Sequence, residues 1–101
     1  MDTHARKLVV IITEAILERR LVEDVKRLGA LGYTACDVRG GGKGGERAGA
    51  WDADRNVELK VIATEAVAEA ICRHVLETYC ANYSVTFFLA DVAVLRPEKF
   101  P

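Results

Sequence analysis

The chain has 101 residues and a mass of 11.1 kDa, and half of its residues are hydrophobic, which predicts one small globular domain spanning 1–101. Its 14 Lys and Arg residues nearly balance 15 Asp and Glu residues, so the net charge of −1 excludes the basic excess on which non-specific nucleic-acid binding depends. The glycines are unevenly distributed along the chain, because six of the eight lie between positions 40 and 49.

The first third of the chain predicts a strand, a helix and a second strand. Residues Lys7–Ile12 include a continuous β-branched, apolar run, which is typical of a central strand covered on both faces. Thr13 is placed to cap the helix that follows, and Gly29 and Gly32 are placed to end it. Residues Tyr33–Val38 predict the second strand. The helix is amphipathic, with a hydrophobic stripe at Leu17, Leu21, Val25 and Leu28.

The second half of the chain repeats this order after a segment, residues 39–55, that has neither helical nor strand periodicity. Apolar residues alternate from Val57 to Val61, and Val85–Leu95 forms a long final strand. A second helical stripe lies between them, at Val67, Ile71, Val75 and Tyr79. The order βαββαβ predicts the α+β, ferredoxin-like split βαβ fold, a four-stranded antiparallel sheet with two helices on one face.

Two helices cover only one face of such a sheet, so the other face needs a partner. The first and last strands are apolar at consecutive positions, Val9 and Val10 in one and Phe87 and Phe88 in the other, and neighbouring residues of a strand point to opposite faces. Exposed apolar patches of this kind usually mark an interface. We therefore expect a homo-oligomer in which the sheets pack together.

The glycine-rich segment 39–55 is much longer than the two to five residues that a hairpin needs. It carries Lys43, Arg47 and Arg55, and glycine backbone with nearby cations is suited to holding phosphate or a small oxyanion. The spacing Gly40-x-Gly42-x-x-Gly45 matches a dinucleotide fingerprint, but no helix opens after it, and the Walker A pattern fails. From composition alone, an anion site and a solvated loop tip are equally open.

Several motifs in this order resemble the PII signalling proteins, in which the insertion between the second and third strands is called the T-loop. The match covers residues 6–95 and is most similar to the SbtB and carboxysome-associated subgroup of PII-like proteins. The residues that carry it are Tyr33-Thr34, Gly41-Gly42-Lys43-Gly44 and the run Asp52-Ala53-Asp54-Arg55-Asn56-Val57. On this resemblance residues 39–55 are the T-loop, and 96–101 form a short C-terminal tail.

The resemblance implies a homotrimer that binds adenine nucleotide in clefts between subunits. It places phosphates against Gly41, Gly42, Lys43 and Gly44, with Arg47 as a further cation. Asn82, Tyr83, Ser84 and Val85 occupy the position of the family's B-loop. Because the glycine-rich B-loop of the classical proteins is missing, ADP or AMP is favoured over ATP. The subgroup's link to inorganic carbon makes bicarbonate a candidate second effector, held by loop N–H groups with Lys43 or Arg47.

The function implied is that of a cytoplasmic, non-enzymatic regulator that signals through its T-loop to a membrane transporter or a carboxysome-associated protein. Trp51, at the tip of the glycine-rich loop, is assigned to partner contact rather than to the nucleotide. The alternative on the same fold is an ACT-like domain that senses amino acids. An RNA-binding module is disfavoured, because Phe87 and Phe88 cannot both stack bases on one sheet face.

The remaining reactive residues predict no catalytic or metal site. The odd number of cysteines and the lack of a signal-peptide pattern favour a reducing cytoplasm, with Cys36 and Cys72 as small buried hydrophobes. The longest apolar run, Leu8–Ile12, is too short to cross a membrane. His74 is expected on the solvated surface of the second helix, and the Arg19-Arg20 pair on the exposed face of the first.

Overall fold

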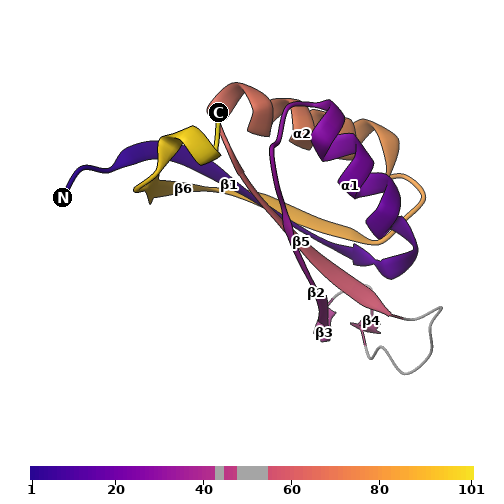
Figure 1. Ribbon diagram of the computed structural model, residues 1–101. Coiled ribbons are helices and arrows are strands. Elements are labelled where there is room, and N and C mark those ends of the chain that lie inside the picture. The colour runs from indigo at the N-terminus through magenta and orange to yellow at the C-terminus, as the bar shows by residue number, and fades with distance from the viewer. Residues whose placement is uncertain (43–44, 48–54) are drawn as a thin grey trace.

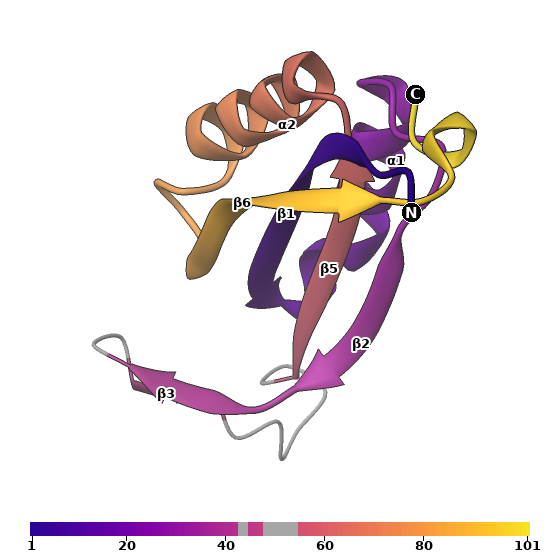
Figure 2. The same cartoon turned by 90° about the vertical axis from the view of Figure 1, so that its left-hand side faces the viewer.

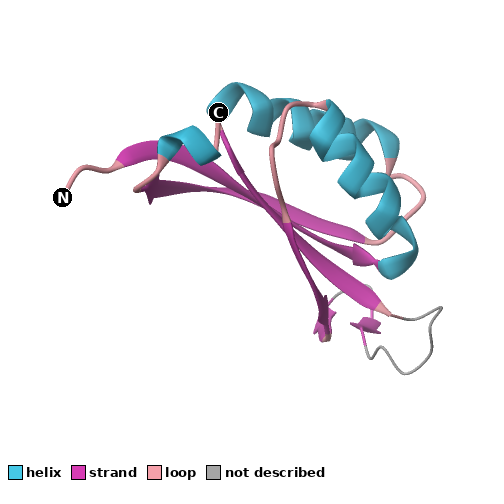
Figure 3. Cartoon of the chain, viewed as in Figure 1, coloured by secondary structure: helices cyan, strands magenta, loops and turns pink. Residues whose placement is uncertain are grey.

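The computed structural model describes residues 1–42, 45–47 and 55–101 (Figure 1). The fold has the predicted class, with a four-stranded antiparallel sheet and both helices on one of its faces (Figure 3). The elements are β1 (His4–Glu14), a 3-10 turn (Ala15–Leu17), α1 (Glu18–Arg27), β2 (Thr34–Val38), β3 (Gly40–Gly42), β4 (Gly45–Arg47), β5 (Asn56–Ala63), α2 (Glu65–Thr78), β6 (Val85–Val94) and a second 3-10 turn (Pro97–Lys99).

The sheet has the strand order β2-β5-β1-β6, so the two long central strands lie between the two edge strands. Residues of β1 alternate between the faces: Val9 and Ile11 point into the core beneath the helices, and Leu8 and Val10 point to the opposite face. In register, Leu8 lies opposite Ile62 of β5, and Val10 lies opposite Phe88 of β6. The face without helices, which we call the open face, is therefore apolar along β1.

The core lies between the sheet and the helices. The helix stripes predicted from the sequence supply it. Leu17, Leu21 and Val25 come from the first 3-10 turn and α1, and Ile71 and Val75 come from α2; each is about 1 % exposed. Burial of each such side chain stabilises the fold by about 1.5–3 kcal/mol relative to leaving it in water. Phe87 packs against this core and Phe88 is 50 % exposed, which confirms that they face opposite sides of the sheet.

The predicted N-cap at Thr13 is wrong. β1 continues through Glu14 because Thr13 stays paired with both β5 and β6 and Glu14 with β5, and α1 begins only at Glu18, after the 3-10 turn. Thr13 is fully buried, and its hydroxyl donates to the carbonyl oxygen of Ser84. Thr64 does cap α2, with its hydroxyl oxygen accepting from the backbone N–H of Val67.

The glycine-rich segment contains regular structure that its sequence did not predict. β3 and β4 pair as a short antiparallel ribbon, with Gly40 opposite Arg47 and Gly42 opposite Gly45. Figure 2 shows β3 continuing from the end of β2, beyond the end of the main sheet. Periodicity is a pattern of side chains, so a run of glycines that pairs only through its backbone gives no such signal.

Two predictions about polar residues are also wrong. Cys36 is exposed, because it lies on the edge strand β2 opposite Glu58, whereas Cys72 is half-buried against the core. His74 is half-buried rather than solvated, and its Nε2 lies 2.9 Å from Oδ2 of Asp24 on α1. Arg19 and Arg20 are exposed as expected, although Arg20 also stacks 5.1 Å from the ring centre of Tyr79.

Asp24, His74 and Tyr79 form a polar link between α1 and α2, and the Tyr79 hydroxyl donates to the Asp24 carboxylate. Burial alone would raise the pKa of Asp24, but hydrogen bonds from Tyr79 and His74 hold that pKa below its ordinary value. Burial and the neighbouring carboxylate raise the pKa of the Tyr79 hydroxyl to about 12. The ionised carboxylate and the neutral phenol are therefore the forms that the folded state favours.

We expect Asp24→Asn to destabilise the fold at neutral pH by about 1.5–3 kcal/mol, the value of hydrogen bonds to a charged group. Because the pKa of Asp24 is lowered by folding, its contribution is present above the carboxyl's ordinary pKa and is lost as the pH falls through the folded value. Urea unfolding from pH 3 to 7 should show a difference between wild type and Asp24→Asn that shrinks in acid. Glu23→Gln, an exposed neighbour on α1, is the matched control, and an equal loss in both variants would contradict this role.

Candidate functional site

Three separate segments meet at the end of the sheet from which β3 extends. Thr13 Oγ1 donates to the Ser84 carbonyl oxygen over 2.8 Å, and the Ser84 N–H donates to Glu14 Oε2 over 2.9 Å. The backbone N–H of Ala15, the residue after Glu14, donates to the Arg55 carbonyl oxygen over 2.8 Å. The last residues of β1 therefore join the turn before β6 to the residue that precedes β5.

A salt bridge closes the same region on the side of β2. Arg55 Nη2 lies 3.0 Å from Oδ1 of Asp37, so the last residue of the segment 39–55 is linked to β2, two residues before the segment begins. We call this group the loop base, and its residues are Thr13, Glu14, Asp37, Arg55 and Ser84. It holds the ends of the glycine-rich segment beside the turn before β6.

Of the four residues expected at the B-loop position, Tyr83 and Val85 pack against the core, whereas Asn82 and Ser84 are exposed. The backbone N–H groups of Asn82 and Tyr83 both donate to the carbonyl oxygen of Tyr79, which forms the turn. The Tyr83 ring packs edge-on to Tyr79 with 6.2 Å between ring centres, and Val85 also packs against the core. Asn82 and Ser84 are exposed, so their side chains are the ones accessible to a ligand from this turn.

The structure places part of the predicted phosphate-contacting segment. Gly41 and Gly42 lie in β3, and Arg47 ends β4. Lys43, Gly44 and Trp51 lie outside the described residues. The structure therefore brings the turn 82–85 to the base of the glycine-rich segment, at one end of the sheet.

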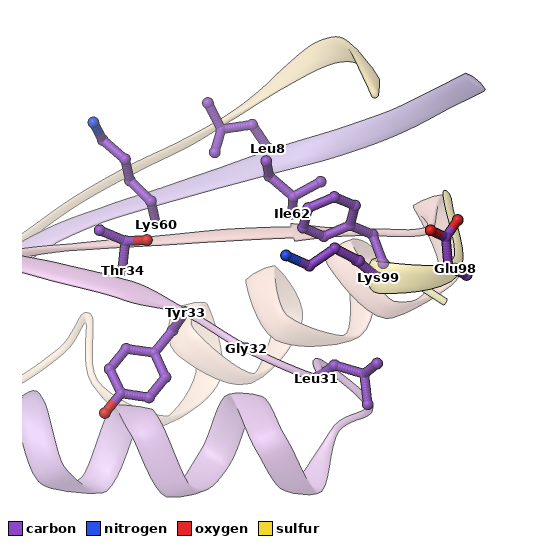
Figure 4. Close-up of a pocket in the computed structure, with 10 residues that line it drawn as sticks. Leu8, Leu31, Gly32, Tyr33, Thr34, Lys60, Ile62, Glu98 and Lys99 are labelled. Carbon is purple, nitrogen blue, oxygen red and sulfur yellow. The ribbon is translucent and has the colours of Figure 1, made fainter. Parts of the chain in front are cut away.

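A second feature, which the sequence did not predict, lies at the opposite end of β2. Here the C-terminal 3-10 turn folds over the open face and forms a groove with a volume of about 810 Å³. Figure 4 shows Leu8 and Ile62 on neighbouring strands with Glu98 and Lys99 beside them, whereas Tyr33 points away toward α1. We call this the C-terminal groove, and its lining residues are Leu8, Leu31, Gly32, Tyr33, Thr34, Lys60, Ile62, Glu98, Lys99 and Phe100.

The C-terminal groove combines an apolar floor with a charged rim. Leu8, Ile62 and Phe100 supply aliphatic and aromatic surface, and Lys60 and Lys99 supply two cations against the single carboxylate of Glu98. Lys60 Nζ also lies 3.2 Å from Oε1 of Glu58 on the same strand. This composition suits a ligand with a flat apolar part and a negative charge.

The C-terminal groove and the glycine strand β3 lie beyond opposite ends of β2 within a single chain. Thr34 lines the groove, and Gly40 begins β3 six residues later. Extended backbone rises about 3.3 Å per residue, so these points are separated by roughly 20 Å. A ligand that contacts both the groove and β3 must therefore either span this distance or lie between two subunits.

The sequence contained part of the signal for this groove. The alternation of Leu8 with Val9, and of Lys60 and Ile62 with Val61, places those side chains on the open face. The approach of Glu98, Lys99 and Phe100 depends on a contact across most of the chain, which periodicity does not reveal. The described residues include no helix long and apolar enough to cross a bilayer, and they hold no cluster of three His, Cys, Asp or Glu residues suited to a metal ion.

Comparisons with known proteins show the family to which this fold belongs. The family model for nitrogen regulatory protein P-II matches residues 6–99. A PII-like signaling protein from Thermus thermophilus is 44 % identical, with all of both chains covered and a TM-score of 0.87. CPII, a nitrogen regulatory PII-like protein from Thiomonas intermedia solved with ADP, AMP and bicarbonate, is 22 % identical over 98 % of this chain and 96 % of its own, with a TM-score of 0.88. The chain belongs to the P-II family.

Proposed function

We propose that this chain is a PII-like regulatory protein that binds ADP or AMP in the clefts between the subunits of a homotrimer. The observation that carries the proposal is the position of two incomplete sites, the loop base and the C-terminal groove, at opposite ends of β2. A nucleotide between subunits would place its base and ribose in the groove of one subunit. Its phosphates would reach the glycine-rich segment of the next.

The apolar open face supports the assembly that this arrangement requires. Leu8 and Ile62 are half-buried and Phe88 is 50 % exposed on a face that no helix covers. Sheets that pack together around a threefold axis would bury this surface, and a heterologous contact repeated three times closes into a ring. Each subunit then presents its groove to the loop base of a neighbour. A sedimentation mass of one chain at micromolar concentration would contradict this assembly.

The ligand assignment rests on chemistry and on the relatives. Phe100 can stack on a purine, and the cations Lys60 and Lys99 can meet its phosphates. The CPII structures contain ADP, AMP and bicarbonate, and we carry these three ligands to this chain as part of the proposal. Gly41, Gly42, Lys43, Gly44 and Arg47 remain the residues proposed to contact phosphate, together with the turn Asn82, Tyr83, Ser84 and Val85.

Bicarbonate is proposed as a second effector that binds beside the phosphates. The backbone N–H groups of glycine-rich segments can hold a small planar anion when a cation such as Lys43 or Arg47 lies near. Both ligands would then order the same segment, so each should raise the affinity for the other. The ordered T-loop, including Trp51, would bind a membrane transporter or a carboxysome-associated protein, and no catalysis is proposed.

Calorimetric titrations with ADP, AMP, ATP and cyclic AMP test this function, each with and without bicarbonate. We expect ADP or AMP to bind most tightly, and bicarbonate to raise that affinity by about 5-fold or more, the lower range of allosteric coupling. A sodium chloride addition of equal ionic strength is the control for bicarbonate. Equal nucleotide affinity in bicarbonate and in sodium chloride would refute the coupling between bicarbonate and nucleotide. Binding of free amino acids in place of nucleotides would refute the nucleotide assignment.

A further inference from the structure

Arg6 connects the beginning of the chain to its end. This half-buried residue of β1 donates from Nε to the carbonyl oxygen of Phe100 over 2.6 Å. Its Nη2 lies 3.4 Å from the carbonyl oxygen of Pro97, and its Nη1 donates to the carbonyl oxygen of Ala5 over 2.8 Å. One guanidinium group therefore contacts both ends of the C-terminal 3-10 turn.

The C-terminal turn has only local support from its own hydrogen bonds. The N–H of Lys99 donates to the Arg96 carbonyl oxygen, and the N–H of Phe100 donates to that of Pro97. The salt bridge between Arg96 and Glu98 joins two side chains that are 70 % and 63 % exposed, and pairs so exposed contribute little stability. These bonds shape the turn, but they do not fix its position against β1, which the contacts of Arg6 do.

The position of this turn determines the shape of the C-terminal groove. Glu98, Lys99 and Phe100 form one wall, opposite Leu8 and Ile62 of the sheet. If the turn moved away from β1, the groove would lose the aromatic side chain of Phe100 and one of its two cations, Lys99. The carbonyl groups that Arg6 binds therefore belong to the same segment that supplies a large part of the ligand contacts proposed in the groove.

We propose that Arg6 is a positioning residue that holds the C-terminal wall of the groove in the conformation that binds an anionic, aromatic ligand. This inference rests on the proposed function, because it assigns the nucleotide to the C-terminal groove. Arg6 itself does not contact the ligand; it acts through Lys99 and Phe100. Loss of Arg6 is expected to release the wall while the core beneath the helices stays intact.

The test compares full-length wild type with Arg6→Met, with Arg6→Lys, which keeps a single donor nitrogen, and with Arg19→Met as the matched control on the exposed face of α1. Two quantities are measured: hydrogen exchange at the amides of Lys99 and Phe100, and ADP affinity by calorimetry. In Arg6→Met we expect these two amides to exchange at least 10-fold faster than in wild type and ADP to bind at least 10-fold more weakly. Arg6→Lys should be intermediate in both quantities. The thermal midpoint of Arg6→Met should match that of Arg19→Met.

The two readouts separate failure of this inference from failure of the proposed function. If wild type binds ADP and Arg6→Met binds it equally well, the positioning role is wrong. If wild type binds neither ADP nor AMP, the nucleotide assignment is wrong, and exchange at Lys99 and Phe100 then decides alone whether Arg6 holds the wall. Exchange rates equal to wild type in Arg6→Met would overturn the positioning role in either case.

Discussion

Replacing Lys60 and Lys99 together by alanine is expected to weaken ADP binding about 100-fold or more. Each lysine at the rim of the C-terminal groove can make a charge-assisted hydrogen bond to phosphate, and such bonds contribute about 1.5–3 kcal/mol. Two of them at the lower value already account for a factor of about 100. Both side chains are exposed, so the fold and its thermal stability should change little.

The control for this double variant removes the same amount of charge elsewhere. Arg19→Ala combined with Arg73→Ala takes two exposed cations from the helices and leaves both the groove and the loop base intact. Calorimetry at two salt concentrations separates a local contact from the overall field of the protein, because long-range attraction is screened by salt. Equal losses of ADP affinity in the two double variants would contradict a specific role for the groove.

Replacing Lys43 and Arg47 together by alanine is expected to lower the affinity for nucleotide and also to remove its response to bicarbonate. Nucleotide affinity should fall by a similar factor, since these are the cations proposed at the phosphates, and bicarbonate should no longer raise the affinity that remains. The groove variant, by contrast, should keep its response to bicarbonate. ADP affinity as high as that of wild type would refute the phosphate site in the glycine-rich segment, and a retained bicarbonate effect would refute its role in the coupling.

The fold could be predicted from the sequence because its signals are local. The two helical stripes and the alternation of strand residues gave the order βαββαβ, and the adjacent Phe87 and Phe88 indicated that both sheet faces are apolar. Thr13 misled the prediction of the helix start because strand pairing outweighed its capping preference. The ribbon of β3 and β4 gave no signal, since glycine pairing leaves no side-chain pattern.

Contacts between distant parts of the chain explain what was missed at the site. The C-terminal groove exists because Arg6 holds residues 97–100 against β1, and the bonded residues are more than ninety positions apart. His74 was misplaced for the same reason, since its partner Asp24 is fifty positions away on the other helix. The family resemblance had assigned both the turn 82–85 and the glycine-rich segment to nucleotide binding, but it did not indicate the hydrogen bonds that join this turn to the end of β1.

Mixed trimers test most directly whether the nucleotide lies between two subunits. Chains with Lys60→Ala and Lys99→Ala are refolded at equal amounts with chains carrying Lys43→Ala and Arg47→Ala, and ADP binding is measured by calorimetry. Each parent should bind ADP about 100-fold more weakly than wild type, but a cleft that combines an intact groove with an intact neighbouring loop is complete, so tight binding should return in about one quarter of the clefts. Mixed trimers that bind no more ADP than either parent would contradict a site shared between subunits.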